Sequence, residues 1–254
     1  AEQAAASTKK KAAKKKKAAK KTNASAPAAK RPRKVEVEGV AVSSADRRVF
    51  GADFIASKGD VARYFAAIAP LILPHVEGRP LSVVRCPTGI TGQHFFQKHI
   101  GKGMPEVIHA LEIEGDDEDW LMVDYAAGLV GLVQMGVLEV HAWGCRPYAP
   151  EQPDRIVMDI DPGDDLPWSR VADAARAVRQ KLEEQGLQTF LKSTGGKGLH
   201  VCAPLDGTAS WDEVKAFCKG VADDLEREAP DLYTANMRKV LRKGRVFVDY
   251  LRNG

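Results

Sequence analysis

Cysteines are few in this sequence, and their spacing matches no metal-binding or disulfide pattern. Only four occur in 254 residues, namely Cys86, Cys145, Cys202 and Cys218, and no two of them form a C-x-x-C pair. The sequence therefore indicates neither a zinc knuckle nor a disulfide framework. A reducing compartment is the simpler expectation.

Long apolar runs are also missing. The longest apolar stretches, 64–76 and 129–140, are interrupted by prolines or by glycines and a glutamine, whereas a membrane-spanning helix needs about 20 apolar residues. The start of the sequence has no apolar segment of the kind found in a secretory signal, so we expect none there. We therefore expect a soluble protein without a membrane partner. The composition, 44% hydrophobic and 28% charged, suits a globular chain.

Acidic residues are almost missing from the first 34 positions, which hold 13 lysines and arginines and a single glutamate. The same segment has no large apolar side chain to bury, so like-charge repulsion should keep it extended. We expect residues 1–34 to be a disordered Lys/Ala-rich tail or interdomain linker, and residues 35–254 to form the folded domain. Contact with DNA phosphates and a plain solvated tether are both open for the tail.

Periodic apolar segments after residue 34 predict a mixed α/β fold. Helical spacing is found over 59–73, 126–135, 167–185 and 211–228. Strands are expected over 81–86, 107–113, 120–124, 138–143, 155–161, 189–193, 199–204 and 245–251. Alternating valines from residue 35 to 42 open a further strand.

Two aspartates end the apolar strand expected over 155–161. Asp159 and Asp161 are two residues apart, so both carboxylates point to one face of the strand, about 6 to 7 Å from each other. Two like charges at this spacing, with no base beside them in the sequence, favour a divalent cation. The following Pro-Gly-Asp-Asp is also good turn chemistry, so a solvated turn is the alternative.

A glycine-rich segment, Ser193-Thr194-Gly195-Gly196-Lys197-Gly198-Leu199-His200, joins two of the expected strands. Glycine backbone N–H groups can close on an anion, Lys197 adds a positive charge, and His200 lies on the strand that leaves the loop. The glycine spacing excludes a Walker A loop and a Rossmann fingerprint. A phosphate-binding loop and a hairpin with a solvent-facing lysine are both open.

A third acidic residue, Asp249, lies within the apolar strand expected over 245–251. The basic residues around it are Arg238, Lys239, Arg242, Lys243, Arg245 and Arg252. Bases around a single inward-facing acid suit a site where a metal ion meets a triphosphate. The alternative is an edge strand whose charges prevent it from pairing with another chain.

The order of these three segments resembles the archaeo-eukaryotic primase superfamily. More closely, the segments VMDIDPG, KSTGGKGLHVCAPL, WDEVKAFCKGVADDLE and KGRVFVDYLRN are similar to the polymerase domain of bacterial ATP-dependent DNA ligases that repair double-strand breaks by non-homologous end joining. The likeness extends upstream through RPLSVVRCPTGITGQHFFQKH and LVGLVQMGVLEVHAWGCRP. It implies an α/β (α+β) primase-type fold, in which a central RRM-like antiparallel sheet flanked by helices carries the acids beside an N-terminal α/β lobe.

The resemblance also implies the residues of a nucleotidyl-transfer site. Asp159, Asp161 and Asp249 would be the catalytic residues and would bind two divalent metal ions, Mn²⁺ by preference or Mg²⁺. The residues that would hold the incoming nucleotide are Ser193, Thr194, Lys197, His200, Arg242, Arg252, His141 and Arg85. The residues that would contact DNA are Phe95, Phe96 and Lys98 at the template bases, and Arg47 and Lys58 at a 5′-phosphate. For the Phe pair, one buried and one exposed ring is the alternative.

The function implied is the addition of nucleotides, with ribonucleotides favoured, to 3′ ends at double-strand breaks and gaps. The implied partners are DNA ends with a 5′-phosphate, nucleoside triphosphates, the ligase and nuclease modules of a parent chain, and a bacterial Ku-type end-binding protein. The implied location is the bacterial cytoplasm, at the nucleoid. Members of this family carry a further arginine beyond the last motif, so we expect a domain truncated at its C-terminus. The alternative function is a noncatalytic module that binds and bridges DNA ends.

Overall fold

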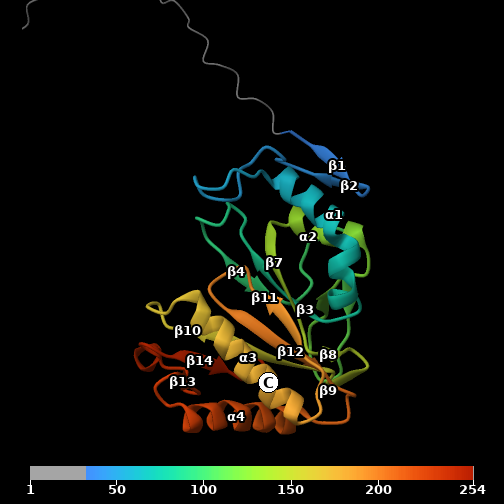
Figure 1. Cartoon of the computed structure of the whole chain (residues 1–254). Coiled ribbons are helices and arrows are strands. Elements are labelled where there is room, and N and C mark those ends of the chain that lie inside the picture. Colours follow the sequence, from blue (N-terminus) through green and yellow to red (C-terminus); the bar gives the residue numbers. More distant parts are fainter. Residues whose placement is uncertain (1–32, 254) are drawn as a thin grey trace, which may run out of the picture. The chain divides into compact units, whose positions relative to one another are not determined.

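The computed structural model describes residues 33–253, so the basic segment expected to be a tail lies almost wholly outside the described residues. Figure 1 shows a mixed arrangement of helices and strands, with the first half of the described chain above the second half in that view. We call residues 33–143 the N-terminal lobe and residues 154–253 the C-terminal lobe. None of the described helices is both long and apolar enough to cross a membrane.

The N-terminal lobe contains a five-stranded sheet and two helices. Its sheet has the strand order β4-β3-β6-β5, with β7 also paired to β3. The strands are β3 (Leu81–Arg85), β4 (Phe95–Gln97), β5 (His109–Leu111), β6 (Trp120–Met122) and β7 (Val137–Ala142). Helices α1 (Lys58–Val76) and α2 (Ala126–Gln134) pack against this sheet through one apolar cluster. The segment expected to begin with one strand forms a hairpin instead, β1 (Val35–Val37) and β2 (Val40–Val42), which turns at Gly39.

The C-terminal lobe is built on a second five-stranded sheet of order β11-β12-β10-β14-β13, antiparallel except for the last pair. The strands are β10 (Arg155–Pro162), β11 (Phe190–Ser193), β12 (Leu199–Pro204), β13 (Tyr233–Thr234) and β14 (Val246–Asp249). The helices are α3 (Trp168–Glu184), α4 (Trp211–Glu228) and the short 3₁₀ helix η1 (Lys239–Arg242). A two-stranded hairpin, β8 (Cys145–Arg146) and β9 (Ala149–Pro153), leads from one lobe to the other.

Alternation along the central strand β10 divides the second sheet into an apolar face and a polar face. Ile156, Met158 and Ile160 are fully buried and belong to the apolar cluster that includes α3 and α4. Since successive side chains of a strand point to opposite faces, Asp159 and Asp161 lie on the face away from these helices. We call this the aspartate face.

One buried ion pair joins the end of α1 to the start of β10. The Nη1 atom of Arg79 donates to Oδ1 of Asp154 at 2.8 Å and to the carbonyl of Cys145 at 3.0 Å. Arg79 is 4% exposed in its side chain, and Asp154 directly precedes β10. Because a buried charge requires a partner, this pair fixes the strand that carries the aspartates against the N-terminal lobe.

Candidate active site

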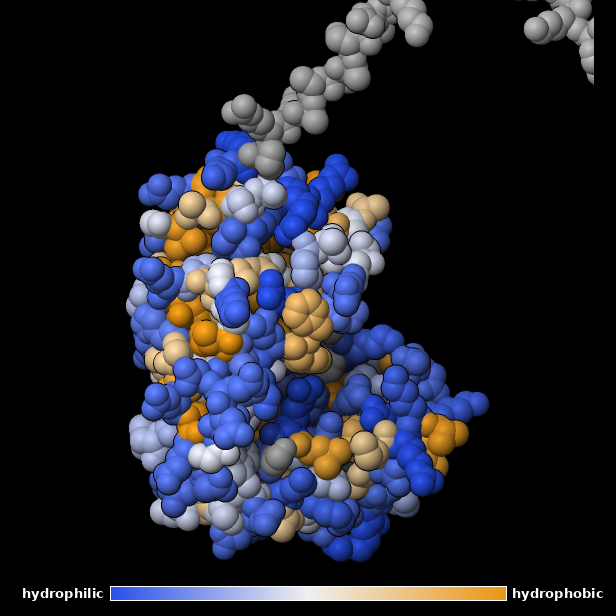
Figure 2. Space-filling model, turned by 180° about the vertical axis from the view of Figure 1, so that it is seen from behind, coloured by the Kyte–Doolittle hydropathy of each residue, from blue (hydrophilic) through white to orange (hydrophobic). Residues whose placement is uncertain are grey.

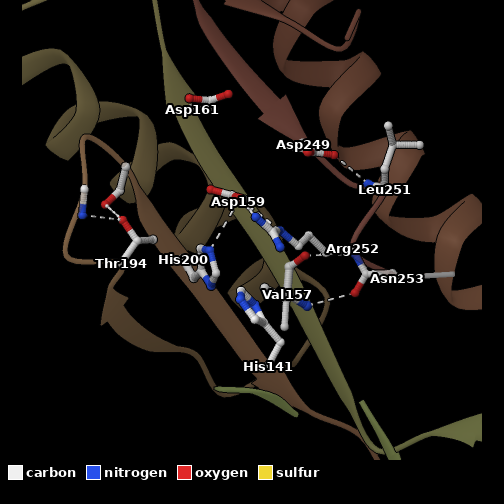
Figure 3. A network of polar contacts seen from close by, with 12 residues as sticks. His141, Val157, Asp159, Asp161, Thr194, His200, Asp249, Leu251, Arg252 and Asn253 are labelled. Atoms are coloured by element: carbon white, nitrogen blue, oxygen red, sulfur yellow. Dashed lines mark hydrogen bonds and ion pairs between the residues drawn. The ribbon is translucent and has the colours of Figure 1, made fainter. Parts of the chain in front are cut away.

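Three aspartates lie together on the aspartate face, as Figure 3 shows. Asp159 of β10 is directly opposite Asp249 of β14, and Asp161 is opposite Phe247 two pairs further along. Directly opposed residues in antiparallel strands share a face, with Cβ atoms about 4.5 to 5.5 Å apart. The sheet register therefore brings together the three acids, which come from two strands far apart in the sequence.

Asp159 is buried, and its carboxylate contacts an arginine and a histidine. Arg252 donates to its Oδ2 atom from Nε at 3.0 Å and from Nη2 at 2.8 Å, and Nε2 of His200 lies 3.4 Å from the same oxygen. Burial alone would raise the pKa of Asp159, but the hydrogen bonds and charges of His200 and Arg252 outweigh it and hold the pKa below its ordinary value. The Asp159 carboxylate is therefore ionised at neutral pH.

The pKa of Asp249 moves in the opposite direction. Burial raises it, and the negative charge of Asp159 raises it further. The Oδ1 atom of Asp249 accepts a hydrogen bond from the backbone N–H of Leu251 at 2.7 Å. The two facing carboxylates thus create a negative potential that a cation would relieve.

Asp161 is paired with Arg242 of η1. The guanidinium of Arg242 also donates from Nη2 to the carbonyl of Met237 at 2.8 Å and stacks 4.2 Å from the ring centre of Phe247. Its Nε atom is buried and has no hydrogen-bond partner within the described residues. Arg242 is therefore held over the aspartate face with its Nε–H unpaired among the described residues.

The glycine-rich loop lies close to the end of β10. A Cβ atom at Gly198 would lie 2.5 Å from the carbonyl oxygen of Ile160, so only glycine fits there. The Oγ1 atom of Thr194 donates to the carbonyl of Gly198 at 3.0 Å and accepts from the N–H of Gly196 at 3.2 Å. Lys197 donates to Oδ1 of Asp164 at 2.7 Å. The loop thus turns sharply beside the aspartates, with Ser193 ending the strand before it.

Two histidines accompany the aspartates. His200 lies opposite Asp159 on β12, is buried, and has an Nδ1 atom without a hydrogen-bond partner in residues 33–253. His141 comes from β7 in the other lobe, and its Nε2 atom lies 3.1 Å from Oε2 of Glu139. In the view of Figure 3 its imidazole lies beyond His200, on the side away from Asp161.

The donor set fits divalent metal ions. Carboxylate oxygens are the ligands that Mg²⁺ and Mn²⁺ prefer, and three aspartates share one face. In the part of the chain that the structure describes, however, no three ligating side chains are already gathered around one point. Instead, Arg252 is paired with Oδ2 of Asp159 and Arg242 with Oδ2 of Asp161, so each arginine occupies one oxygen that a metal ion could use.

The structure does not bring Arg85 to the aspartates. Its Nε atom donates to the carbonyl of Met135 at 3.0 Å, its Nη1 atom donates to Oε1 of Gln97 at 2.8 Å, and its guanidinium lies 5.4 Å from the ring centre of Phe95. These contacts tie together β3, β4 and the end of α2. They give Arg85 a place within the N-terminal lobe rather than on the aspartate face.

The two adjacent phenylalanines are both exposed. Phe95 is 40% exposed and Phe96 is 70% exposed, on the edge strand β4, so the alternative with one buried ring is wrong. The ring centre of Phe96 lies 5.8 Å from that of His141. Lys98 follows, with Nζ 4.6 Å from the ring centre of Trp120. An aromatic surface therefore lies beside one histidine of the candidate site.

Arg47 and Lys58 lie together at the start of α1. Lys58 is only 4% exposed, and its Nζ atom donates at 2.8 Å both to the backbone carbonyl and to Oε1 of Gln134. Burial, and then the charge of Arg47, lowers the pKa of Lys58 to about 8. The Nε atom of Arg47 is buried and without a partner among residues 33–253. The pair forms a basic site in the N-terminal lobe, separate from the aspartates.

Sequence reasoning missed Asn253. This residue is 1% exposed, and its Oδ1 atom accepts from the N–H of Val157 at 2.8 Å, while its Nδ2 atom donates to the Val157 carbonyl at 2.9 Å. It thus fastens the turn that carries Arg252 to β10. No local pattern indicates a contact between residues 96 positions apart.

Comparison with known proteins identifies the family of the chain. The family model of the LigD primase-polymerase domain matches residues 57–254. The chain is 40% identical over 219 residues to the multifunctional non-homologous end joining protein LigD of Pseudomonas aeruginosa, covering 85% of this chain and 26% of that protein. It is 34% identical over 224 residues to LigD of Mycobacterium tuberculosis, covering 84% and 29%. The chain therefore spans less than a third of the length of these relatives.

A solved structure shows the same fold. It is the polymerase domain from Mycobacterium tuberculosis ligase D in complex with DNA, which matches with a TM-score of 0.78 and 34% identity, covering 84% of this chain and 78% of that one. The expected mixed fold with an antiparallel sheet is thereby confirmed. From the matched family model, the sequence identity and the shared fold, the chain belongs to the LigD primase-polymerase domain family.

Proposed function

We propose that this domain adds nucleotides to 3′ ends at double-strand breaks and gaps, with ribonucleotides preferred and a template strand read where one is present. The observation that carries the proposal is the single sheet face that holds Asp159, Asp161 and Asp249 in a chain of this family. Three carboxylates beside two arginines suit the transfer of a nucleotidyl group from a triphosphate.

In the proposed mechanism the three aspartates would hold two divalent ions, Mn²⁺ or Mg²⁺. Bound there, the ions would supply activation of a 3′-hydroxyl and charge neutralisation for the leaving pyrophosphate. Arg242 and Arg252, which are paired with aspartates in this structure, would turn toward the triphosphate. Guanidinium groups are suited to this exchange because they bind carboxylate and phosphate oxygens with the same donor geometry.

The remaining polar groups orient the nucleotide. The proposed roles are phosphate binding by Ser193, Thr194 and Lys197, and contact with the ribose or a phosphate by His200 and His141. The buried Nδ1 atom of His200, without a partner in the described chain, supports this role because a buried polar atom normally has a hydrogen-bond partner. A contact between Arg85 and the nucleotide would require the release of donors that are engaged within the N-terminal lobe.

The N-terminal lobe is proposed to hold the DNA end. The exposed Phe95 and Phe96 stack on template bases with Lys98 beside them, and Arg47 and Lys58 bind the 5′-phosphate at the far side of a gap. The solved relative was determined in complex with DNA. The proposed partners, besides DNA ends and nucleoside triphosphates, are ligase and nuclease modules of a longer chain and a Ku-type end-binding protein at the bacterial nucleoid.

Primer extension on a 5′-phosphorylated gapped duplex with Mn²⁺ tests the proposal. The wild-type protein should incorporate ribonucleotides faster than deoxyribonucleotides. The Asp159→Ala/Asp161→Ala variant should lose at least about 100-fold in rate, because metal ions supply several kcal/mol to such reactions. The matched control is Asp173→Ala, an exposed aspartate on α3, which should retain the wild-type rate. Equal rates for both variants would contradict the assigned roles.

The exposed Phe pair and the basic site at Lys58 also suit a noncatalytic module that binds and bridges DNA ends. The same assay separates the two functions. Binding that requires a 5′-phosphate, together with no incorporation by the wild-type protein under any metal condition, would favour the noncatalytic module. Incorporation that the double variant abolishes would exclude it.

A further inference from the structure

The row of residues that contains Asp159 continues across the sheet to its edge. Asp159 lies opposite His200 on β12, and His200 lies opposite Lys192 on β11. The neighbouring row runs from Val157 through Cys202 to Phe190. Because directly opposed residues share a face, Lys192 and Phe190 lie on the aspartate face.

The electrostatics of Cys202 agree with this placement. Burial raises the pKa of the Cys202 thiol, and the positive charges of Lys192 and Arg155 act against that rise. Cys202 is opposite Phe190, so the Lys192 ammonium is close to the row that contains Phe190. The edge strand thus presents an aromatic ring and a positive charge side by side.

Both side chains are available for a ligand. Phe190 is 55% exposed, and all four residues of β11 are exposed. The Lys192 side chain makes no hydrogen bond or ion pair with any residue of the described range 33–253, whereas Lys197, Arg242 and Arg252 are each paired with an aspartate. Lys192 is therefore an uncompensated positive charge beside an exposed ring.

The position of Phe190 separates its ring from the glycine-rich loop, whereas Lys192 directly precedes Ser193 and lies opposite His200. The glycine-rich loop joins β11 to β12, and Phe190 precedes Thr194 by four residues, which corresponds to about 13 Å along a strand. β11 is an edge strand of the sheet, so no further described strand pairs with its outer side. A ring for stacking and a cation for the backbone are what sequence-tolerant binding of a single strand requires.

We propose that Phe190 and Lys192 bind the unpaired template strand beside the catalytic aspartates, Phe190 by stacking on a base and Lys192 by neutralising a phosphate. This inference rests on the proposed function, since it assumes that a template is read at this face. The pair is distinct from Phe95 and Phe96, which belong to the other lobe. It gives the template a second contact, on the sheet that carries the catalytic residues.

The test compares Phe190→Ala and Lys192→Gln with Leu191→Ala. Leu191 is the matched control because it is 65% exposed on the same strand and lies opposite Val201, whose side chain belongs to the helix-side cluster. The affinity for a recessed duplex with a single-stranded template overhang, and for the blunt duplex of the same length, is measured by fluorescence anisotropy over a salt series. Nucleotide KM at saturating DNA is measured in parallel.

Phe190→Ala should weaken overhang binding by about 5- to 150-fold, which corresponds to one lost stacking contact. Lys192→Gln should reduce the slope of log affinity against log salt by about 0.7. Leu191→Ala should match the wild type, and affinity for the blunt duplex should be unchanged in all three. Phe190→Tyr should restore overhang binding, which separates stacking from a general loss of structure; thermal unfolding of each variant provides a further control.

The proposal is wrong if Phe190→Ala and Lys192→Gln bind the overhang as tightly as Leu191→Ala, or if they raise only the nucleotide KM and leave DNA affinity unchanged. Failure of the proposed function has a different signature. In that case the wild-type protein incorporates no nucleotide, while the difference in overhang affinity between Phe190→Ala and Leu191→Ala is measured independently of catalysis.

Discussion

The guanidinium of Arg252 donates two hydrogen bonds to one oxygen of Asp159, from Nε at 3.0 Å and from Nη2 at 2.8 Å. This arginine supplies the positive charge that a buried carboxylate requires. We therefore expect a divalent ion at Asp159 to compete with Arg252 for the same carboxylate, whose Oδ2 atom the arginine occupies. The competition makes metal and nucleotide binding depend on each other, because a triphosphate gives the displaced arginine a new partner.

Arg252→Ala should have opposite effects on the two ligands. With the competing guanidinium removed, Mn²⁺ alone should bind several-fold more tightly in titration calorimetry, whereas the KM for nucleotide should rise because a triphosphate contact is lost. Arg176→Ala, which removes an exposed arginine of α3, is the control and should change neither value. Weaker Mn²⁺ binding by Arg252→Ala would show that the arginine does not compete with the ion.

Gly198→Ala should damage both the loop and the fold. The new methyl group would lie 2.5 Å from the carbonyl oxygen of Ile160, a backbone atom that cannot move aside easily. Overpacking of this kind costs about 1 to 3 kcal/mol, measured as the free energy of unfolding in urea. Gly196→Ala is the matched control, because its Cβ would meet only Thr194 Oγ1, at 3.7 Å. Equal stability of the two variants would contradict the close contact.

Asp154→Ala should be among the more destabilising single changes. It leaves the buried guanidinium of Arg79 without its carboxylate, and breaking a buried pair in this way costs about 3 to 5 kcal/mol. Urea unfolding measures the loss. Replacing both partners, Arg79→Met with Asp154→Leu, should cost less than Asp154→Ala alone. A double variant as unstable as the single one would argue against an uncompensated charge as the cause.

The affinity for 5′-phosphorylated ends should depend on pH through Lys58. Its pKa of about 8 is far below the ordinary 10.5, so the positive charge that attracts a phosphate is lost as pH rises above about 8. The preference for 5′-phosphate over 5′-hydroxyl ends, measured from pH 6.5 to 9.5, should fall over this range in the wild type. Lys58→Arg should keep its preference, since an arginine stays charged.

The ionisation of Lys58 also makes the stability of the fold depend on pH. Its folded pKa lies below its unfolded value, so the folded state binds the proton less tightly and the lysine opposes folding most below about pH 8. This opposition fades as pH rises toward 10.5. The wild type should accordingly gain stability between pH 7 and pH 10, and Lys58→Met should not. The difference in the free energy of unfolding, variant minus wild type, should therefore fall over this range. A constant difference would place the ammonium in a more solvated site.

The sequence predicted the chemistry-bearing strands because their patterns are local. The strand expected over 155–161 is observed as Arg155–Pro162, and the helix expected over 211–228 has those bounds. Both bounds could be predicted because apolar residues recur at the spacing of a strand or of a helix, which gives each element one apolar and one polar face. The strand β4 was missed because both of its phenylalanines are exposed, so no apolar face marks it.

Contacts between residues far apart in the sequence could not be predicted from local patterns. That Asp249 lies opposite Asp159 follows from the sheet register, which no segment of the sequence specifies alone. The pairing of Arg242 with Asp161 depends on η1, a single short turn without apolar periodicity. The resemblance to the polymerase domain named these residues, but their mutual arrangement required the structure.

Asn253 has a consequence for how the site is made. If β14 continued in register past Asp249, residue 251 would face Val157 across the ladder. Instead, the carboxamide of Asn253 occupies that place and exchanges both hydrogen bonds with Val157, as a peptide group would. A side chain that imitates the backbone lets the main chain leave the sheet without exposing unpaired groups on β10. Residues 250–252 therefore leave the ladder and form a corner between Asp249 and Asn253. From this corner the side chain of Arg252 contacts Asp159, in a direction that a regular strand would not give it.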